Sequence, residues 1–279
     1  MRVGISNIAW DTQDDGAVSE LLGRYGIKHI DIAPGKYFEN PVSAREHEIL
    51  KVKRWWNEQG ISLYGMQSLL FGTSGLNLFS QESIQKRMLD HLESVIRVAA
   101  LLGITKVVFG SPKNRDLSGL TSAQADKVAL DFFGRLGEIA KSYEVIVCIE
   151  PNPECYGCNF LTHTPEALEF VKALDHSAVK LQLDTGAIAI NQEDPAEVIK
   201  QSWGWVGHLH ASEPDLLPLG SANTNHILCG EVLNGLGPEM PISIEMRAVE
   251  RARSLQVIED SLRLAISHYG TAAEAGKAS

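Results

Sequence analysis

The sequence lacks any apolar run close to the ~20 residues that a membrane-spanning helix needs. Its first residues, MRVGISNIAW, lack the long apolar stretch and the small-residue cleavage site of a secretory signal. Four cysteines in a chain of 279 residues are too few to suggest a disulfide scaffold. We therefore expect a cytoplasmic protein that does not enter a membrane.

Basic residues are also scarce, because 25 Lys and Arg stand against 35 Asp and Glu, for a formal net charge of −10. Such a balance argues against a broad attraction to nucleic acid or to anionic membranes. No Gly-x-Gly-x-x-Gly turn follows the first apolar segment, which weakens the case for a dinucleotide-binding open sheet. The expected partner is a small molecule, and the sequence leaves a homo-oligomer open.

Short apolar or β-branched segments alternate with longer helix-like segments along the chain. This alternation predicts βαβ units around a parallel sheet. The eight expected strands are Val3–Trp10, His29–Ala33, Ser62–Leu69, Lys106–Gly110, Val145–Glu150, Lys180–Asp184, Val206–His210 and Ile242–Glu245. Because about 250 residues are typical of a (β/α)8 barrel, we predict a single-domain TIM barrel over residues 1–269. A doubly wound open sheet is the alternative.

Apolar residues recur every three or four positions in several segments, as one buried helix face requires. The clearest expected helices are Ala44–Glu58, Glu82–Leu102, Ser122–Tyr143 and about Leu255–His268. Thr121 and Thr164 sit where N-caps are expected, and Gly60 and Gly103 where helices should end. The tail at residues 270–279, rich in Ala, Gly, Lys and Ser, is expected to be flexible.

An acidic residue or a histidine ends each of the last four expected strands. These residues are Glu150 in VIVCIE, Asp184 in KLQLD, His210 in VGHLH and Glu245 in ISIE. The carboxyl ends of barrel strands meet at the mouth where active sites of this fold lie. Three carboxylates and one imidazole suit Mn²⁺ best, with Mg²⁺, Co²⁺ or Zn²⁺ as other candidates. The alternative is that these acids pair with Arg or Lys at the rim.

From Val3 to about His268 the chain resembles the sugar phosphate isomerase/epimerase superfamily, the xylose-isomerase-like TIM barrels. This group includes ketose 3-epimerases and inosose dehydratase. The residues that carry the resemblance are Glu150-Pro151, Asp184-Thr185, His208-Leu209-His210 and Glu245. The resemblance implies one divalent metal held by Glu150, Asp184, His210 and Glu245. It also implies that Glu150 and Glu245 move the substrate proton.

Three positions depart from the ketose 3-epimerase pattern. A histidine that follows the aspartate there is Ala187 here, a second glutamate is Tyr156, and an arginine after the metal histidine is Leu216. Since all three missing groups handle the substrate, we do not expect free tagatose or psicose to be the substrate.

Other polar residues on the same rim are candidates for substrate binding. In the segment FGSPKNRD, Lys113 and Arg115 could clamp a phosphate or carboxylate, or could belong to a solvated loop. Gln67 could bind a hydroxyl group. Glu213 could bind a sugar hydroxyl or steady the surroundings of the metal, and Arg247 could pair with Glu245 or with the substrate.

Four further residues are more ambiguous. His208 shares a strand face with His210 but lies deeper, so we expect it to support a ligand rather than to bind the metal. His226 lies at the start of an expected helix region, where it could cap the helix or enter the pocket. Cys155 and Cys158 form a CxxC pair, but no second pair follows at zinc spacing, and we expect no metal or redox role for them.

The sequence thus favours a metal-dependent isomerase or epimerase of a sugar or sugar derivative. Its reaction would remove a proton next to a carbonyl and pass through a metal-bound enediolate. A dehydratase or lyase of a keto-sugar or inosose on the same site is the main alternative. A nuclease similar to endonuclease IV and a non-catalytic sugar-binding barrel fit the sequence less well.

Overall fold

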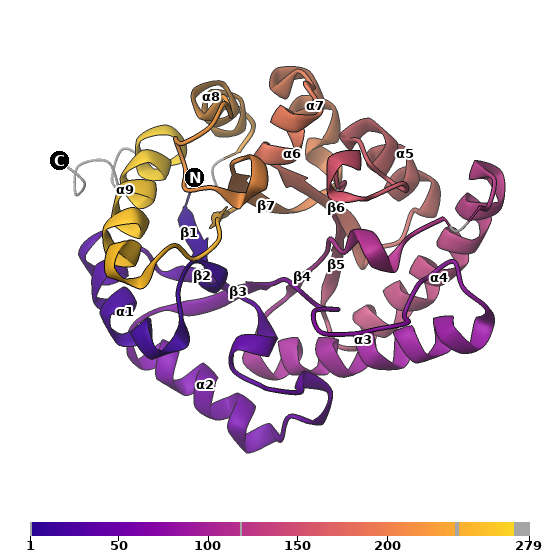
Figure 1. Ribbon diagram of the computed structural model, residues 1–279, viewed down its shortest axis with the longest axis horizontal. Coiled ribbons are helices and arrows are strands. Elements are labelled where there is room, and N and C mark those ends of the chain that lie inside the picture. Colours follow the sequence, from indigo (N-terminus) through magenta and orange to yellow (C-terminus); the bar gives the residue numbers. More distant parts are fainter. Residues whose placement is uncertain (1, 118, 238–239, 271–279) are drawn as a thin grey trace.

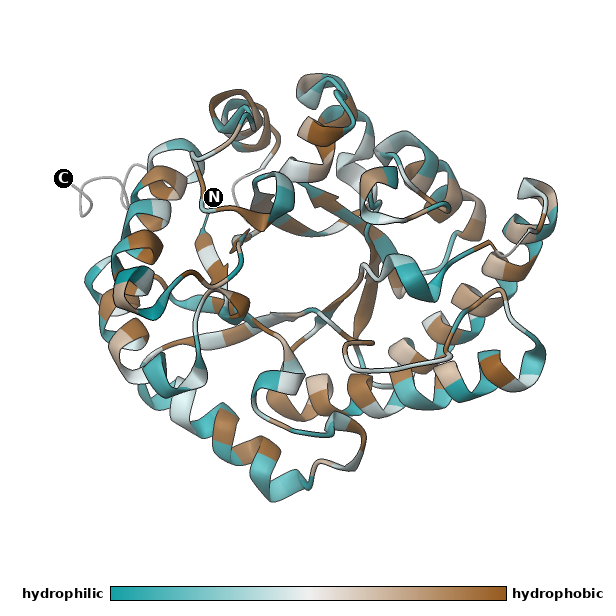
Figure 2. Ribbon diagram, in the orientation of Figure 1, coloured by the Kyte–Doolittle hydropathy of each residue, from teal (hydrophilic) through white to brown (hydrophobic). Residues whose placement is uncertain are grey.

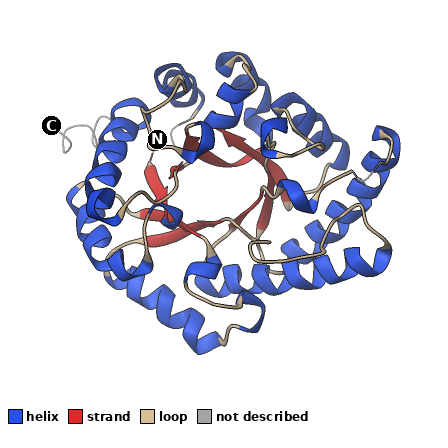
Figure 3. Ribbon diagram, in the orientation of Figure 1, coloured by secondary structure: helices blue, strands red, loops and turns tan. Residues whose placement is uncertain are grey.

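A closed barrel of eight parallel strands, paired in chain order from β1 to β8, forms the centre of the molecule (Figure 1). The computed structural model describes residues 2–117, 119–237 and 240–270. Helices lie between successive strands and surround the barrel (Figure 3). The predicted single-domain TIM barrel is therefore confirmed, and the open sheet is excluded. Of the tail expected to be flexible, only Gly270 lies within the described residues.

The strands are short, and most are buried on both faces. Their bounds are β1 (Val3–Ser6), β2 (His29–Ile32), β3 (Ser62–Met66), β4 (Lys106–Phe109), β5 (Ile146–Ile149), β6 (Val179–Asp184), β7 (Val206–Ser212) and β8 (Ile242–Glu245). The first strand was expected to continue to Trp10. It ends at Ser6 because the Ser6 side chain caps a 3-10 turn over Asn7–Ala9. The third strand was expected to reach Leu69 but ends at Met66.

The helices pack their apolar faces against the barrel (Figure 2). Their bounds are α1 (Asp15–Arg24), α2 (Glu46–Glu58), α3 (Glu82–Leu102), α4 (Ser122–Ser142), α5 (Thr164–Leu174), α6 (Thr185–Ile190), α7 (Pro195–Ser202), α8 (His226–Leu236) and α9 (Arg251–Tyr269). The bounds predicted for α3 are confirmed. In that helix Met88, Leu92, Val95 and Ala99 are buried, as the predicted spacing requires.

Helix ends agree with the sequence in most places. Thr121 caps α4 and accepts a hydrogen bond from the backbone N–H of Gln124, and Gly103 ends α3 in the left-handed conformation. The prediction for Thr164 was wrong, because this residue begins α5 and His163 takes the capping position. There, Pro165 supplies a fixed φ in the first turn, which is a second common way to begin a helix.

Strand register places the polar residues of the last strands at one height. Asp184 of β6 pairs with His210 of β7, and Ser212 of β7 pairs with Glu245 of β8. Glu150 follows the last residue of β5, whose Ile149 pairs with Leu181 of β6. The barrel therefore brings these side chains to the same rim. In the parts of the chain that the structure describes, every helix is too short or too polar to span a lipid bilayer.

A glycine in β3 makes room for two buried side chains inside the barrel. A Cβ atom at Gly65 would collide with the Asp31 carboxylate and would lie 2.6 Å from Nε2 of His208. Asp31 and His208 are both buried, so neither can move into solvent. A side chain at position 65 would therefore displace the pair.

We predict that Gly65→Ala destabilises the protein because well-packed interiors accommodate an added methyl poorly. The expected loss in the free energy of unfolding is about 1–3 kcal/mol, measured by urea denaturation. Gly23→Ala is the matched control, since Gly23 lies in α1 and a Cβ added there would meet nothing within 4 Å. That variant should be neutral or slightly stabilising. Equal stability of the two variants would contradict the packing argument.

Candidate metal site at the barrel mouth

Four side chains from consecutive strands converge at the carboxyl end of the barrel. They are Glu150, Asp184, His210 and Glu245, and one potential ligand atom of each lies within 4.8 Å of the others. Nδ1 of His210 lies 3.5 Å from Oε1 of Glu150 and 3.3 Å from Oε2 of Glu245. The structure thus brings together all four residues predicted from the sequence. We refer to them as the tetrad.

The donor atoms of the tetrad fit a divalent cation. Three carboxylates and one imidazole offer mostly oxygen ligands, and burial makes the repulsion between the carboxylates strong. Oε1 of Glu150 is buried and has no hydrogen-bond partner within the described residues. A carboxylate oxygen left in this state is suited to coordinate a cation.

The pKa values of the tetrad respond to this crowding. Burial, together with the charges of Glu245 and Glu150, raises the pKa of Asp184 to about 7. Burial lowers the pKa of His210, but Glu245, Asp31 and Glu150 together raise it well above its ordinary value. Burial acts to raise the pKa of Glu245, but His210 and Gln67 hold this pKa below its usual range. Protons bound to these groups thus balance the negative charge of the metal-free site. A bound cation would take their place, so metal binding would release protons.

Asp31 contacts the imidazole of His210 on the side opposite Glu150 and Glu245. This residue was not identified from the sequence. Its Oδ2 atom lies 3.0 Å from Nε2 of His208 and 3.5 Å from Nε2 of His210. His210 therefore presents Nδ1 to the carboxylates above and Nε2 to Asp31. A carboxylate behind a metal-binding histidine commonly fixes its tautomer and ring orientation. Burial acts upward on the Asp31 pKa, but His208 and His210 hold it well below its ordinary value.

Each carboxylate of the tetrad is also held by a neighbouring hydrogen-bond donor. Nε2 of Gln67 donates to Glu245 at 2.5 Å, and Nδ2 of Asn152 donates to Oε2 of Glu150 at 3.1 Å. For Asp184 the donors are the Ser212 hydroxyl and the Ala187 backbone N–H, both at 2.7 Å. These contacts fix the orientation of the carboxylates. Asn152 and Ser212 were not singled out in the sequence, where an amide or hydroxyl near a strand end is common.

Two of the residues expected to bind substrate are buried and form hydrogen bonds within the protein. Arg115 is fully buried, and its Nη2 atom donates to the backbone carbonyl of Glu150 at 2.7 Å. Burial lowers the pKa of Arg115, against the effect of the nearby Cys158 and Glu150. Glu213 is buried as well, and its carboxylate accepts hydrogen bonds from the backbone N–H groups of Gly220 and Thr224.

His226, the first residue of α8, contacts Glu213 and Tyr269. Nε2 of His226 lies 3.2 Å from Oε1 of Glu213, and its Nδ1 atom lies 2.6 Å from the Tyr269 hydroxyl. His226 therefore links the β7–α8 loop to α9. The helix α8 begins at this residue, but the expected capping role belongs to Asn225, whose side chain accepts a hydrogen bond from the backbone N–H of Leu228.

Two cavities meet at the tetrad. The first, of about 210 Å³, includes Phe71 and the exposed Lys113 in its lining and is called the Phe71 lobe here. The second, of about 270 Å³, includes the exposed Arg247 and is called the Arg247 lobe. Glu150 and Glu245 line both lobes. A molecule bound at the tetrad would therefore reach Lys113 on one side and Arg247 on the other.

The three positions that depart from the ketose 3-epimerase pattern lie together. Tyr156, Ala187 and Leu216 all line the Arg247 lobe. Gln67 lines the Phe71 lobe, and Glu213 contributes to the wall of the Arg247 lobe. The departures noted in the sequence thus alter one continuous wall of the cavity rather than three scattered sites.

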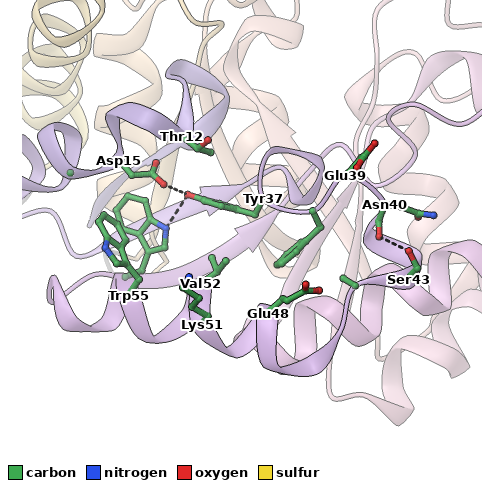
Figure 4. Close-up of a pocket in the computed structure, with 14 residues that line it drawn as sticks. Thr12, Asp15, Tyr37, Glu39, Asn40, Ser43, Glu48, Lys51, Val52 and Trp55 are labelled. Carbon is green, nitrogen blue, oxygen red and sulfur yellow. Dashed lines mark hydrogen bonds between the residues drawn. The ribbon is translucent and has the colours of Figure 1, made fainter.

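A larger groove of about 710 Å³ lies elsewhere, between the start of α1 and α2 (Figure 4). Its most enclosed polar groups already have partners. The Tyr37 hydroxyl donates to Asp15 at 3.1 Å and accepts from Trp56 at 3.0 Å, and Trp10 donates to the other Asp15 oxygen at 2.7 Å. None of the tetrad is in its described lining. The tetrad and its two lobes therefore form the candidate site.

Known proteins match the chain in sequence and in fold. A D-psicose 3-epimerase of Ruminiclostridium cellulolyticum is 32% identical over 80 residues, and the match covers 28% of this chain and 27% of that protein. A structure of D-psicose 3-epimerase with D-tagatose, from Clostridium cellulolyticum H10, is similar with a TM-score of 0.80 and 18% identity. That similarity covers 97% of this chain and 100% of the other.

A second similar structure is that of the IOLI protein with a bound zinc atom. Its TM-score is 0.73 at 17% identity, and the similarity covers 96% of this chain and 99% of the other. At these identities the two structures show a shared fold. The family described as Xylose isomerase-like TIM barrel matches residues 20–267. Because this match spans most of the chain, the protein belongs to the Xylose isomerase-like TIM barrel family.

Proposed function

We propose that the protein is a divalent-metal-dependent isomerase or epimerase of a sugar or sugar derivative. The observation that carries this proposal is the arrangement of Glu150 and Glu245. Both lie beside Nδ1 of His210, and both line the two lobes where a substrate can bind. Two carboxylates in one cavity can remove a proton from a substrate carbon and return it elsewhere. The D-psicose 3-epimerase relative supports this class of reaction.

The tetrad would hold the metal ion, and we propose Mn²⁺ because three of the four ligands are carboxylates. The zinc in the IOLI structure indicates that this fold can also hold a softer ion. A divalent cation held there would supply Lewis-acid chemistry that lowers the pKa of a C–H group next to a substrate carbonyl. Asp184 and His210 serve as ligands only, since Ser212 and Asp31 fix them from behind.

Glu150 and Glu245 act as the acid and base in this proposal. Asn152 and Gln67 each donate one hydrogen bond to a glutamate, and the other oxygen of each glutamate faces Nδ1 of His210, where it can take a ligand or a proton. One glutamate removes the proton next to the carbonyl. A glutamate then returns it to another carbon, which isomerises the sugar, or to the other face of the same carbon, which epimerises it.

The residues at the cavity walls would hold the rest of the substrate. Lys113 and Arg247 are exposed at the rims of the two lobes, where each can bind an oxygen or an anionic group. Oε1 of Gln67 is buried without a described partner and can accept a hydrogen bond from a hydroxyl. Glu213 and Arg115 would act indirectly, through the β7–α8 loop and the backbone of Glu150.

We predict that Glu150→Gln and Glu245→Gln each lower proton exchange by about 10²–10⁴-fold, because amides cannot accept the proton. The Mn²⁺-loaded protein would be incubated in D2O with a panel of ketoses, keto-sugars and inososes. Deuterium incorporation next to the carbonyl would be read by mass spectrometry. Glu154→Gln, an exposed change in the same loop, is the matched control and should exchange like the wild type.

Three outcomes of this experiment would count against the proposal. Near wild-type exchange in either glutamate variant would remove that residue from the acid–base pair. A product that has lost water would assign the site to a dehydratase instead. No exchange with any carbonyl compound of the panel would reject the isomerase and epimerase proposal for these substrates.

We predict that Asp31→Asn weakens Mn²⁺ binding by about 10–100-fold, as is typical when the partner of a metal-binding histidine is removed. The amide keeps the shape of Asp31 but loses the charge that orients His208 and His210. Binding of Mn²⁺ would be measured by electron paramagnetic resonance titration of the metal-free protein. Asp131→Asn, an exposed change on α4, is the control. Unchanged affinity in Asp31→Asn would show that His210 needs no such support.

A further inference from the structure

Most polar side chains of the Arg247 lobe are committed to partners within the protein. Outside the tetrad, the polar residues of its described lining are Asn152, Tyr156, Ser212, Glu213 and Arg247. The Asn152 amide and the Ser212 hydroxyl each donate to a carboxylate of the tetrad. The Glu213 carboxylate accepts from two backbone N–H groups, and the Tyr156 hydroxyl accepts from the backbone N–H of Asp215 at 2.7 Å. The Arg247 side chain, in contrast, forms no hydrogen bond or ion pair with any described residue.

The backbone around Arg247 is held on two sides. Its N–H group donates to the Leu216 carbonyl at 2.8 Å, and the N–H group of Ala248 donates to the Ile8 carbonyl at 3.0 Å. The segment that follows Glu245 is thereby tied to the loops after β7 and β1. The uncommitted guanidinium therefore extends from a defined position at the rim of the lobe.

Arg247 returns a positive charge to a wall that has lost one. Ketose 3-epimerases carry an arginine where this chain has Leu216. Leu216 and Arg247 line the same lobe, and their backbones are joined by the hydrogen bond just described. The other two departures, Tyr156 and Ala187, bring no cation to it. Arg247 is thus the only cationic side chain in the described lining of this lobe.

A neutral molecule covered with hydroxyls would find few partners in this lobe. Each hydroxyl taken out of water needs a new hydrogen bond, but most of the polar side chains are engaged. The lining also includes residues without a polar side chain, namely Pro112, Pro151, Pro153, Ala187 and Leu216. A lobe with one free guanidinium is suited to a ligand that concentrates its polarity in a single anionic group.

A carboxylate matches this guanidinium better than a phosphate does. Two parallel N–H groups of an arginine can bind the two oxygens of a carboxylate. A phosphate would bring close to two negative charges and a third terminal oxygen. The described lining of the lobe has no second cation to pair with them. The chemistry of the lobe thus favours a carboxylate.

We propose that the substrate is an acidic sugar, with its carbonyl at the tetrad and a carboxylate bound by Arg247. A ketose whose terminal CH2OH group is oxidised to a carboxylate is a molecule of this kind. This inference rests on the proposed function, because it takes the sugar carbonyl to lie at the tetrad. Arg247 then selects acidic ketoses over neutral ones, and it offsets the negative charge that three carboxylates bring to the site.

Matched pairs of ketoses and their acids test this assignment. The pairs are D-fructose with D-fructuronate, D-tagatose with D-tagaturonate, and L-sorbose with its uronate, and each differs only in one terminal group. Apparent affinities for the Mn²⁺-loaded protein would be measured by isothermal titration calorimetry. We expect at least one acid to bind about tenfold more tightly than its neutral partner, as charge-assisted hydrogen bonds allow. Added NaCl should narrow the difference, because Arg247 is exposed.

Variants at position 247 link the preference to the guanidinium. Arg247→Gln should reduce the acid-to-neutral affinity ratio to about one, whereas Arg247→Lys should keep part of it because the charge remains. Arg253→Gln is the matched control, since Arg253 is exposed on α9 and outside the described lining of both lobes. Because the Arg247 side chain has no partner among the described residues, its replacement should leave the thermal unfolding midpoint nearly unchanged.

Several results would overturn the inference. One is equal or absent binding in every pair, and another is a ratio that survives Arg247→Gln. A ratio lost in Lys113→Gln but kept in Arg247→Gln would place the carboxylate in the Phe71 lobe instead. Ketose phosphates that bind more tightly than the acids, and lose this advantage in Arg247→Gln, would assign the guanidinium to a phosphate.

Failure of this inference and failure of the proposed function give different results. Deuterium exchange on neutral ketoses, without tighter binding of any acid, would reject the inference and keep the proposed function. A preference for acids that depends on Arg247, without exchange on any ketose or acid, would keep the role of Arg247 in binding and reject the isomerase or epimerase.

Discussion

The repulsion among three carboxylates held in the interior of a barrel is the constraint on which the site depends. Charges that would be well hydrated apart are brought within a few ångströms of one another around His210, where water cannot screen them fully. Positive charge must therefore be present at their centre. Protons on His210 and Asp184 can supply it, as the raised pKa values of both groups indicate. A divalent cation would supply the positive charge at neutral pH and would not require a proton on Glu150 or Glu245.

Two glycines in the barrel provide the space that this crowded arrangement needs. Gly65 leaves space for Asp31 and His208 below His210, and Gly110 leaves space for the Glu150 carboxylate beside it. Register then sets the height of each group, since Asp184 lies opposite His210 and Glu245 opposite Ser212. Because a closed barrel has no free edge, this register cannot slip at one strand without disturbing all the others.

Much of the fold and of the tetrad could be predicted because the signals are local. Each tetrad residue follows apolar strand residues, and four such ends on consecutive strands must meet once the barrel closes. The support for those residues could not be predicted in the same way. Asp31 lies between two isoleucines inside β2, and its contact with His208 and His210 depends on strands far apart in sequence. Likewise, nothing in FGSPKNRD distinguishes the exposed Lys113 from the buried Arg115.

The position of Arg115 determines which kind of donor contacts the Glu150 carboxylate. An arginine that formed an ion pair with the Glu150 carboxylate would stabilise its charged form and make it a poor acceptor of protons. Here the guanidinium binds the backbone carbonyl of the same residue instead, and Asn152, an uncharged donor, contacts the carboxylate. Orientation and charge are thereby controlled separately: Arg115 fixes the backbone of Glu150, and an uncharged amide orients its carboxylate.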